Sequence, residues 1–423
     1  MRTGIKRGLC TALAGLLLFG GVLTASVLGS ALPAAATTVV QTIGVGYGPN
    51  AVSSDGTHVW VTNRNSATVT ELVASTGAVV QTIGVGSLPD GVSSDGTHVW
   101  VANGGANTVT ELVASTGAVV QTIGVGSGPA AVSSDGTHVW VANSGETTVT
   151  ELSASTGAVV RTIGVGQSPQ AVSSDGTHVW VANTGDTTVT ELSASTGSVV
   201  RTIGVGLHPT GISSDGTHVW VANFDGGTVT ELDASTGAVV RAIGAWVNPQ
   251  GISSDGTHVW VTNFSDTLAA NTVPELDAST GAVVQINDVG SGAAAVSSDG
   301  THVWVANFLD NTVTELASRF AITTTSLPPA TPGVAYGPVT LQQAGSDPSA
   351  SPYVTAFKWK KVILPKGLKL SSAGVLSGTP SAKLTAGPSS VTVQVTETVT
   401  TLNGKKKVKT KTTVQATIPL TIT

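Results

Sequence analysis

The chain has 423 residues and is poor in several residue types, and each shortage narrows what it can be. Its 1 cysteine, Cys10, lies in the N-terminal leader described below, which excludes disulfides and thiol chemistry from the rest of the chain. Charged residues make up 10% of the sequence, and residues 37–318 contain no lysine. No stretch after the leader has the period of an amphipathic helix, so we expect an all-β protein.

Motifs for metals, cofactors and nucleic acids are also missing. The recurring Gly-Val-Gly reads as turn chemistry at a strand end and not as a phosphate-binding loop. His58 and its six equivalents occur once per repeat, too far apart to share a metal, and nothing has zinc-ligand spacing. Residues 37–318 hold 4 Arg and 23 acidic residues, a net charge of −19. We therefore expect no cofactor, no metal and no nucleic-acid partner.

What the sequence does contain is a repeat. The segment SSDGTHVWV occurs seven times, the first six copies 40 residues apart and the last 44, with its tryptophan at Trp60, Trp100, Trp140, Trp180, Trp220, Trp260 and Trp304. Each unit holds four short β-patterned runs, which we name A to D. A period near 40 with four strands per unit predicts a β-propeller of seven blades, one blade per repeat.

Details of one unit give further expectations. Asp135-Gly136 lies between the A and B runs and predicts a two-residue hairpin with φ > 0 at both positions. Apolar residues on both faces of the B and D runs predict that both strands are buried. The last repeat has no D run, so we expect residues 39–45 to pair with residues 312–316 and close the ring.

The two ends carry other signals. Residues 1–36 read as a secretory signal peptide, with three positive charges, an apolar run from Leu9 to about Leu28, and a cleavage site at Ala34-Ala35-Ala36. Cys10 precedes most of the apolar run, which disfavours the alternative of a lipoprotein anchor. We expect a secreted protein without a membrane span. Since no sortase-like LPxTG end is present, any retention at the cell surface would be non-covalent.

From Arg319 the repeat stops, and residues 319–423 predict a small Ig-like β-sandwich. Asn403-Gly404 marks a hairpin in it. This part carries 12 basic and 2 acidic residues, a net charge of +10, with five lysines clustered on the hairpin: Lys405, Lys406, Lys407, Lys409 and Lys411. The cluster reads as a solvated, edge-protecting strand, as a site for an anionic polymer of the envelope, or as a partner of the acidic propeller.

Two resemblances follow from these motifs. DGTHVWVAN or DGTHVWVTN followed by TVTEL, STGAVV and TIGVG resembles the YVTN-type propeller repeat over residues 37–318, with Trp in place of the usual Tyr. Similar DG…W strands occur in streptogramin-lyase-like propellers. LPKGLKL (364–370) with GVLSGTP (374–380) resembles the Ig-like domain of bacterial surface and secreted proteins. Neither family implies a single activity.

Variation among the repeats points to a candidate site. The A–B and C–D turns are nearly identical in every unit, whereas the B–C and D–A loops, expected on the opposite rim, differ in each. Bulky side chains gather on the loops of blades five to seven and blade one, with carboxylates beside them. The candidate ligand-binding residues are Tyr47, His208, Phe224, Asp225, Trp246, Phe264, Asp266, Phe308 and Asp310. Aromatic faces beside carboxylates suit a sugar, a peptide or a cation; alternatively, these rings only cover the edge of the core.

Three functions fit this sequence. The first is a monomeric secreted or cell-surface binding protein that holds an envelope polymer, a glycan, a peptide or a surface protein on its variable rim. The second is a propeller lyase or hydrolase with its site near blades five to seven and His208 as acid or base, for which no nucleophile or fixed carboxylate partner is evident. The third is a structural or adhesive protein without a specific ligand. We assign no catalytic residue.

Overall fold

The computed structural model describes residues 39–244, 246–265, 271–317, 321–322, 327–340, 343–344, 356–403 and 406–423. The expected signal peptide, residues 1–36, lies outside them. The described residues are almost entirely strands and turns, joined by one short 3-10 helix, η1 (Arg64–Ser66). In this part of the chain no helix is long and apolar enough to cross a membrane.

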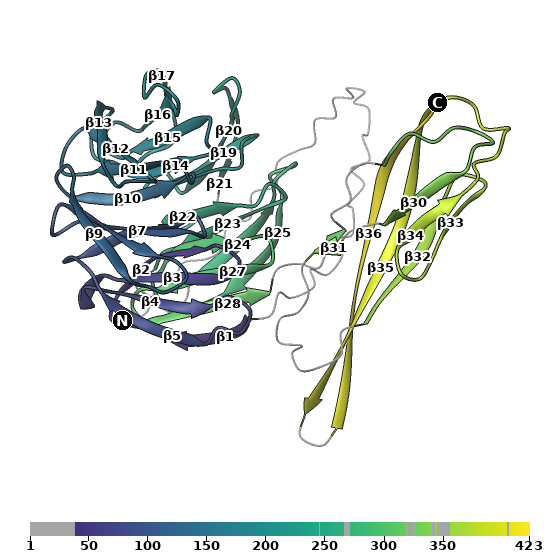
Figure 1. Cartoon of the computed structure of the whole chain (residues 1–423), viewed down its shortest axis with the longest axis horizontal. Coiled ribbons are helices and arrows are strands. Elements are labelled where there is room, and N and C mark those ends of the chain that lie inside the picture. The colour runs from purple at the N-terminus through teal and green to yellow at the C-terminus, as the bar shows by residue number, and fades with distance from the viewer. Residues whose placement is uncertain are drawn as a thin grey trace, which may run out of the picture. The chain divides into compact units, whose positions relative to one another are not determined.

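Seven four-stranded antiparallel sheets follow one another along the chain (Figure 1). The first contains β2 (Pro49–Ser54), β3 (His58–Asn63), β4 (Thr68–Val73) and β5 (Val79–Gly84). The second contains β6 (Pro89–Ser94), β7 (His98–Asn103), β8 (Thr108–Val113) and β9 (Val119–Gly124). The third contains β10 (Pro129–Ser134), β11 (His138–Asn143), β12 (Thr148–Ser153) and β13 (Val159–Gly164). The fourth contains β14 (Pro169–Ser174), β15 (His178–Asn183), β16 (Thr188–Ser193) and β17 (Val199–Gly204).

The remaining three sheets complete the series. The fifth contains β18 (Pro209–Ser214), β19 (His218–Asn223), β20 (Thr228–Asp233) and β21 (Val239–Gly244). The sixth contains β22 (Pro249–Ser254), β23 (His258–Asn263), β24 (Thr272–Asp277) and β25 (Val283–Asp288). The seventh combines β26 (Ala293–Ser298), β27 (His302–Asn307) and β28 (Thr312–Ala317) with the N-terminal strand β1 (Val39–Gly44).

The sheets form a closed circle. The first strand of each sheet contacts the first strand of the next, and β26 of the seventh sheet contacts β2 of the first. β1 pairs with β28 from Val39↔Leu316 to Gly44↔Thr312, which confirms the closure expected from the sequence. Two strands far apart in sequence, β1 and β28, thus belong to one sheet, and β28 has no open edge.

The core lies between neighbouring sheets. The tryptophan of each sheet is fully buried against valines and a leucine of the next sheet, as Trp100 is against Val139, Val141 and Leu152. The same packing joins Trp304 of the seventh sheet to the first. Since burial of a large side chain is worth several kcal/mol, these seven contacts are the main apolar force that holds the circle together.

Two expectations about the repeat unit were wrong. The D strands are outermost, and their valines stay about half exposed, as Val79 (49%) and Val80 (50%) are; the buried strands are B and C. In the A–B turn, only Gly136 of the Asp135-Gly136 pair has positive φ (82°). Asp135 instead accepts hydrogen bonds from the backbone N–H groups of Thr137 (2.9 Å) and His138 (2.7 Å), so its side chain shapes a three-residue loop.

The C-terminal residues form two three-stranded sheets and a two-stranded one. The first sheet has the order β30 (Tyr336–Thr340), β34 (Val375–Gly378), β33 (Leu368–Leu370), and the second β32 (Ala356–Ile363), β35 (Gly387–Asn403), β36 (Lys406–Ile422). β29 (Ala321–Ile322) pairs with β31 (Gln343–Ala344). A separate core includes Tyr336, Trp359, Leu376 and Val391.

The hairpin expected at Asn403-Gly404 is confirmed, because β35 and β36 pair as far as Asn403↔Lys406. Gly404 and Lys405 lie outside the described residues. The glycines of the LPKGLKL and GVLSGTP motifs have a structural reason. Gly367 and Gly378 have φ of 97° and 130°, and a Cβ on either would collide with backbone of the facing segment.

Candidate functional site

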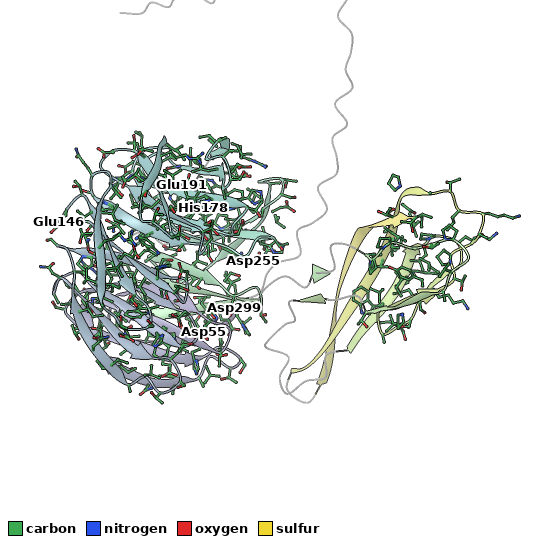
Figure 2. The ribbon with its side chains drawn as sticks, turned by 45° about the horizontal axis from the view of Figure 1, so that its top comes forward. Asp55, Glu146, His178, Glu191, Asp255 and Asp299 are labelled. Atoms are coloured by element: carbon green, nitrogen blue, oxygen red, sulfur yellow. The ribbon has the colours of Figure 1, made fainter. Side chains whose placement is uncertain are left out.

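Two kinds of loop share each rim of the circle, as the sequence predicted. The loop between the second and third strands of a sheet (the BC loop) bonds to the connection that enters the same sheet (the DA loop). In the first sheet, for example, the N–H of Arg64 donates to the carbonyl of Gly48 (2.9 Å). On the other rim, Ala74 N–H bonds to Thr57 O, which joins the A–B and C–D turns. We call these the variable rim and the turn rim; Figure 2 shows Glu146 on the side opposite Asp55, Asp255 and Asp299.

The three phenylalanines lie at equivalent positions on the variable rim. Each leads a BC loop, and its backbone N–H donates to the DA loop: Phe224 to His208 O (2.8 Å), Phe264 to Asn248 O (3.0 Å) and Phe308 to Gly292 O (2.8 Å). All three side chains are partly buried. The Phe308 ring lies beside Gly48, where an added Cβ would be 3.1 Å from Phe308 Cε2. The rings therefore lie at the base of the rim, in three adjacent sheets.

The fifth sheet brings two of the predicted residues into direct contact. His208 Nδ1 lies 2.6 Å from Asp225 Oδ2, and the His208 ring meets the Phe224 ring edge-on at a centroid distance of 6.1 Å. Both polar side chains are exposed, His208 by 45% and Asp225 by 60%. His208 holds φ at 56°, as the residues at the equivalent position do in every sheet: Gly48, Leu88, Gly128, Ser168, Asn248 and Gly292. This left-handed backbone is therefore a feature of the repeated DA loop and does not distinguish His208.

The predicted carboxylates differ in their role. Asp310 Oδ2 accepts the backbone N–H of Ser291 (2.6 Å), and Asp186 does the same for Gln167 (2.6 Å), so this is a structural cap of the DA loop. In the fifth sheet Gly226 occupies that position, and Asp225, one residue earlier, turns to His208 instead. Asp266 lies outside the described residues. Asp225 is thus the described candidate whose carboxylate caps no backbone and pairs with an exposed histidine, and the residues alone did not distinguish it from Asp310.

Trp246 marks a departure from the repeat. It occupies the position of a glycine such as Gly206, where an added Cβ would lie 2.6 Å from Cγ of Asn223. The indole packs on the apolar cluster between the fifth and sixth sheets, which includes Trp220, Val259 and Leu276. The equivalent asparagine of the sixth sheet is Asn263. Pro274 replaces one of the two threonines that this asparagine bonds in other sheets, and the bond of Asn263 to Thr272 (2.9 Å) remains. Trp246 and Pro274 are thus two departures from the repeat in and next to the sixth sheet.

Sequence reasoning missed several apolar side chains on the same rim. Leu207 is 60% and Val247 55% exposed, each next to a predicted residue, and Leu309 is 46% exposed. Tyr47, which was predicted, is 70% exposed. Their signal was available: Leu207 and Tyr47 stand where other repeats have Ser87, Ser127 and Ser291. These exposed apolar side chains lie on the loops of sheets one, five, six and seven, all on the variable rim.

The polar residues repeated in every sheet have structural partners. Glu71 and its equivalents are buried on the third strands, where Gln81 donates to Glu71 (2.7 Å) and Arg161 pairs with Glu151 (2.8 Å). Burial raises the pKa of Glu151, against the lowering effect of Arg161. Asn63 donates to Thr68 (3.0 Å) and Thr70 (2.9 Å) and so ties the BC loop, as expected. Among the described residues no group of three or more His, Cys, Asp or Glu is placed to hold a metal ion.

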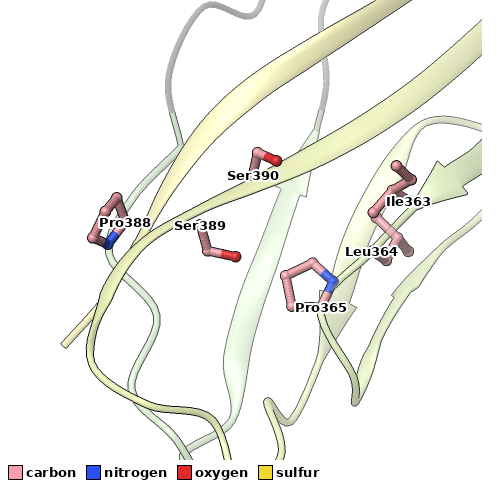
Figure 3. A pocket seen from close by; sticks show the side chains of 6 residues that line it. All are labelled: Ile363, Leu364, Pro365, Pro388, Ser389 and Ser390. Atoms are coloured by element: carbon pink, nitrogen blue, oxygen red, sulfur yellow. The ribbon is translucent and has the colours of Figure 1, made fainter.

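One cavity lies in the C-terminal domain, apart from the predicted site residues. It measures about 420 Å³ and is lined by Ile363, Leu364, Pro365, Pro388, Ser389 and Ser390 (Figure 3). It is open to solvent, and the side chains that line it are apolar residues and two serines, with no charged residue among them.

A closed circle of four-stranded antiparallel sheets with repeats of about 40 residues defines a β-propeller. No family model matches the chain, and no curated protein does. Among solved structures, the chain is similar to one from Kuenenia stuttgartiensis hydrazine synthase, with 20% sequence identity and a TM-score of 0.56, over 70% of this chain and 98% of that one. This likeness supports the fold alone.

Proposed function

We propose that the chain is a secreted or cell-surface binding protein that holds a glycan, peptide or protein partner on the variable rim. In this proposal residues 37–318 are a seven-bladed propeller of the YVTN type, residues 319–423 an Ig-like β-sandwich that spaces or tethers it, and residues 1–36 a signal peptide. The observation that carries the proposal is the exposed apolar group on that rim, Tyr47, Leu207 and Val247, beside half-buried aromatic rings.

A second candidate function is a lyase or hydrolase that uses His208. The contact of His208 Nδ1 with Asp225 Oδ2 (2.6 Å) favours it, because a carboxylate that orients a histidine is part of many acid–base sites. Both side chains are well exposed, however, and a general base gains most of its effect where water is excluded. We therefore place this function second.

The chain supplies its own conservative variants for the test. Serine occupies the positions of Tyr47 and Leu207 in three other repeats, so the double variant Tyr47→Ser/Leu207→Ser keeps the loop framework. We expect this variant to lose at least about tenfold in binding to purified cell-envelope fractions, because it removes two exposed apolar contacts worth about 1 kcal/mol each. Pull-down of the full-length protein, titrated against the fractions, measures this.

Two controls separate the parts of the proposal. Val80→Thr changes an exposed residue on an outer strand, away from the variable rim, and should leave binding unchanged. A chain truncated after residue 317 tests the tether. Binding lost in the truncated chain but kept by the double variant would assign recognition to the C-terminal domain and contradict a ligand-binding rim.

A further inference from the structure

The innermost strands carry a bulge at one fixed place. In six sheets the register between the first and second strands shifts just after the first residue, as between Pro49 and Ala51, so one residue of the inner strand has no partner. In the sixth sheet the shift spans Pro249 to Ile252 and leaves Gln250 and Gly251 outside the pairs. These bulged residues are Asn50, Asp90, Ala130, Gln170, Thr210, Gln250 and Ala294. They are also the positions at which the otherwise constant inner strand varies most. A bulge re-aims a side chain, so this pattern suggests a role beyond the scaffold.

Because the innermost strands contact one another in a closed circle, the bulged residues surround its axis on the variable rim. Their printed contacts agree with this placement. Asn50 Nδ2 donates to Asp90 O (2.9 Å) in the next sheet, and Thr210 Oγ1 lies 3.3 Å from Gln250 O in the sheet after its own. Gln170 is exposed, and the amides of Gln170 and Gln250 have no hydrogen-bond partner among the residues that the structure describes.

We call the ring of bulged residues the inner circle. The first residue of each BC loop lies next to it, and these first residues divide the inner circle into two arcs. Arg64 reaches from the first sheet to Asp90 of the second (2.5 Å), and Thr184 Oγ1 donates to Pro209 O of the next sheet (2.6 Å). The same position holds Phe224, Phe264 and Phe308 in sheets five to seven. We call the region around the axis on this rim the axial mouth. One side of the axial mouth is therefore aromatic, and the other side carries Arg64, Gly104, Ser144 and Thr184.

Three of the described carboxylates on the rim have partners. Asp90 is paired with Arg64, Asp225 with His208, and Asp310 with the backbone of Ser291. Arg64 is also the one lysine or arginine on this rim. The other three arginines of residues 37–318 lie on fourth strands and pair with glutamates on the third strands of the same sheets. A polyanion finds no free cation here, and the acidic surplus of the propeller repels it. Among the bulged residues Asp90 is paired with Arg64, so the groups left there for a ligand are amides and hydroxyls, with the aromatic rings of the BC loops beside them.

We infer that the axial mouth of the variable rim binds a neutral oligosaccharide, with a sugar ring on the phenylalanine arc and its hydroxyls on the amides of Gln170, Gln250 and Asn50. Side-chain amides suit hydroxyl groups because each both donates and accepts, and an aromatic ring covers the apolar face of a sugar. This inference rests on the proposed function and narrows its ligand to one class.

Calorimetric titration of the full-length protein tests it with three kinds of probe of equal length. These are neutral hexasaccharides (chitohexaose, cellohexaose and maltohexaose), anionic hexagalacturonate and a hexalysine peptide. We expect at least one neutral probe to bind and the charged probes to bind at least about tenfold more weakly. Gln170→Ala and Gln250→Ala, which copy Ala130, should each weaken the neutral probe about threefold to tenfold, since each removes one hydrogen-bonding group.

Phe264→Thr, which copies Thr184, should weaken the neutral probe about tenfold by removal of one ring contact. Val80→Thr should change nothing, and the thermal midpoint of each variant shows that it is folded. A neutral probe that binds all variants equally would overturn the site. Binding of only hexagalacturonate or hexalysine, or of no probe, would overturn the ligand class. In either case the envelope experiment with Tyr47→Ser/Leu207→Ser still decides the proposed function, because it requires no particular chemistry of the partner.

Discussion

At the residue scale, the repeated aspartate of the A–B turn does two structural tasks. Its Oδ1 accepts the backbone N–H groups of its own turn, as Asp299 does for Thr301 (2.9 Å) and His302 (2.8 Å). Its Oδ2 accepts a serine hydroxyl from the next sheet, as Asp299 does from Ser54 (2.5 Å). A single side chain thus fixes a loop and a sheet boundary, which explains why SSDG is repeated without a ligand.

Burial alone would raise the pKa of Asp299, but hydrogen bonds from His302, Ser54 and Thr301 lower it from 3.8 to about 2. The folded state therefore releases this proton more readily than the unfolded state. The resulting stability is present above about pH 4 and is lost as the pH falls toward about 2. We expect Asp299→Asn to lower the free energy of unfolding at pH 7 by about 2 kcal/mol, from the size of this shift.

Urea unfolding at pH 7 and at pH 3 measures the effect. The difference between Asp299→Asn and the parent chain should shrink at pH 3, because part of the parent's aspartate is then protonated on unfolding. Burial lowers the pKa of His302, but Asp299 raises it by more, so the net direction is upward and its contribution is lost as the pH rises past this raised pKa. An equal loss at both pH values would show that the charge of Asp299 is not what stabilises the boundary.

At the scale of elements, β1 has the least local support. It belongs to the seventh sheet but lies more than 250 residues from its partner β28 in the sequence, as the bond from Gln41 to Glu315 shows (separation 274 residues). Ile43 packs against the core between the seventh and first sheets. Without β1, the edge of β28 would be open to solvent and to other chains.

A chain that begins at residue 45 should fold less stably by about 3–5 kcal/mol, because it loses five backbone pairs and the contacts of Ile43. Thermal unfolding and size-exclusion chromatography would detect the lower midpoint and association through the open edge. Gln41→Ala is the matched control, since it removes the side-chain bonds to Glu315 and Thr76 and keeps the strand. An unchanged midpoint in the shortened chain would mean that closure contributes little to stability.

At the scale of the whole molecule, the described residues have two kinds of core. Seven apolar clusters join neighbouring sheets of the circle, and one separate cluster, with Trp359 and Leu376, belongs to the C-terminal sheets. The charge is divided in the same way, −19 in residues 37–318 and +10 in residues 319–423. From these separate cores and charges we predict that residues 37–318 fold independently of residues 319–423.

We therefore expect a chain truncated after residue 317 to keep the main calorimetric transition of the full-length protein within about 3 °C, because a shift of about 1 kcal/mol moves a large domain by only that much. Differential scanning calorimetry of both chains makes the comparison. Loss of the main transition on truncation would show that the propeller depends on the C-terminal residues.

Much of this protein follows from the sequence alone. We correctly predicted the seven repeats, the four strands of each, the closing strand and the pairing of loops on each rim. These features depend on hydrogen-bond partners and turn residues that occur in all seven repeats. Within each repeat these features depend on neighbouring positions, and the closing strand follows from the D run that the last repeat lacks.

Other features were decided only by the tertiary structure. The D strands read as buried but are outermost, since a hydrophobic run does not say how far from the axis its strand lies. Asp225 and Asp310 look alike in sequence, yet one caps a backbone and the other pairs with His208, because a shift of one position along the loop changes which group each carboxylate meets. Bulges at Asn50 and its equivalents arise from the register between strands. Depth, direction and register are properties of the packed circle, and no single repeat contains them.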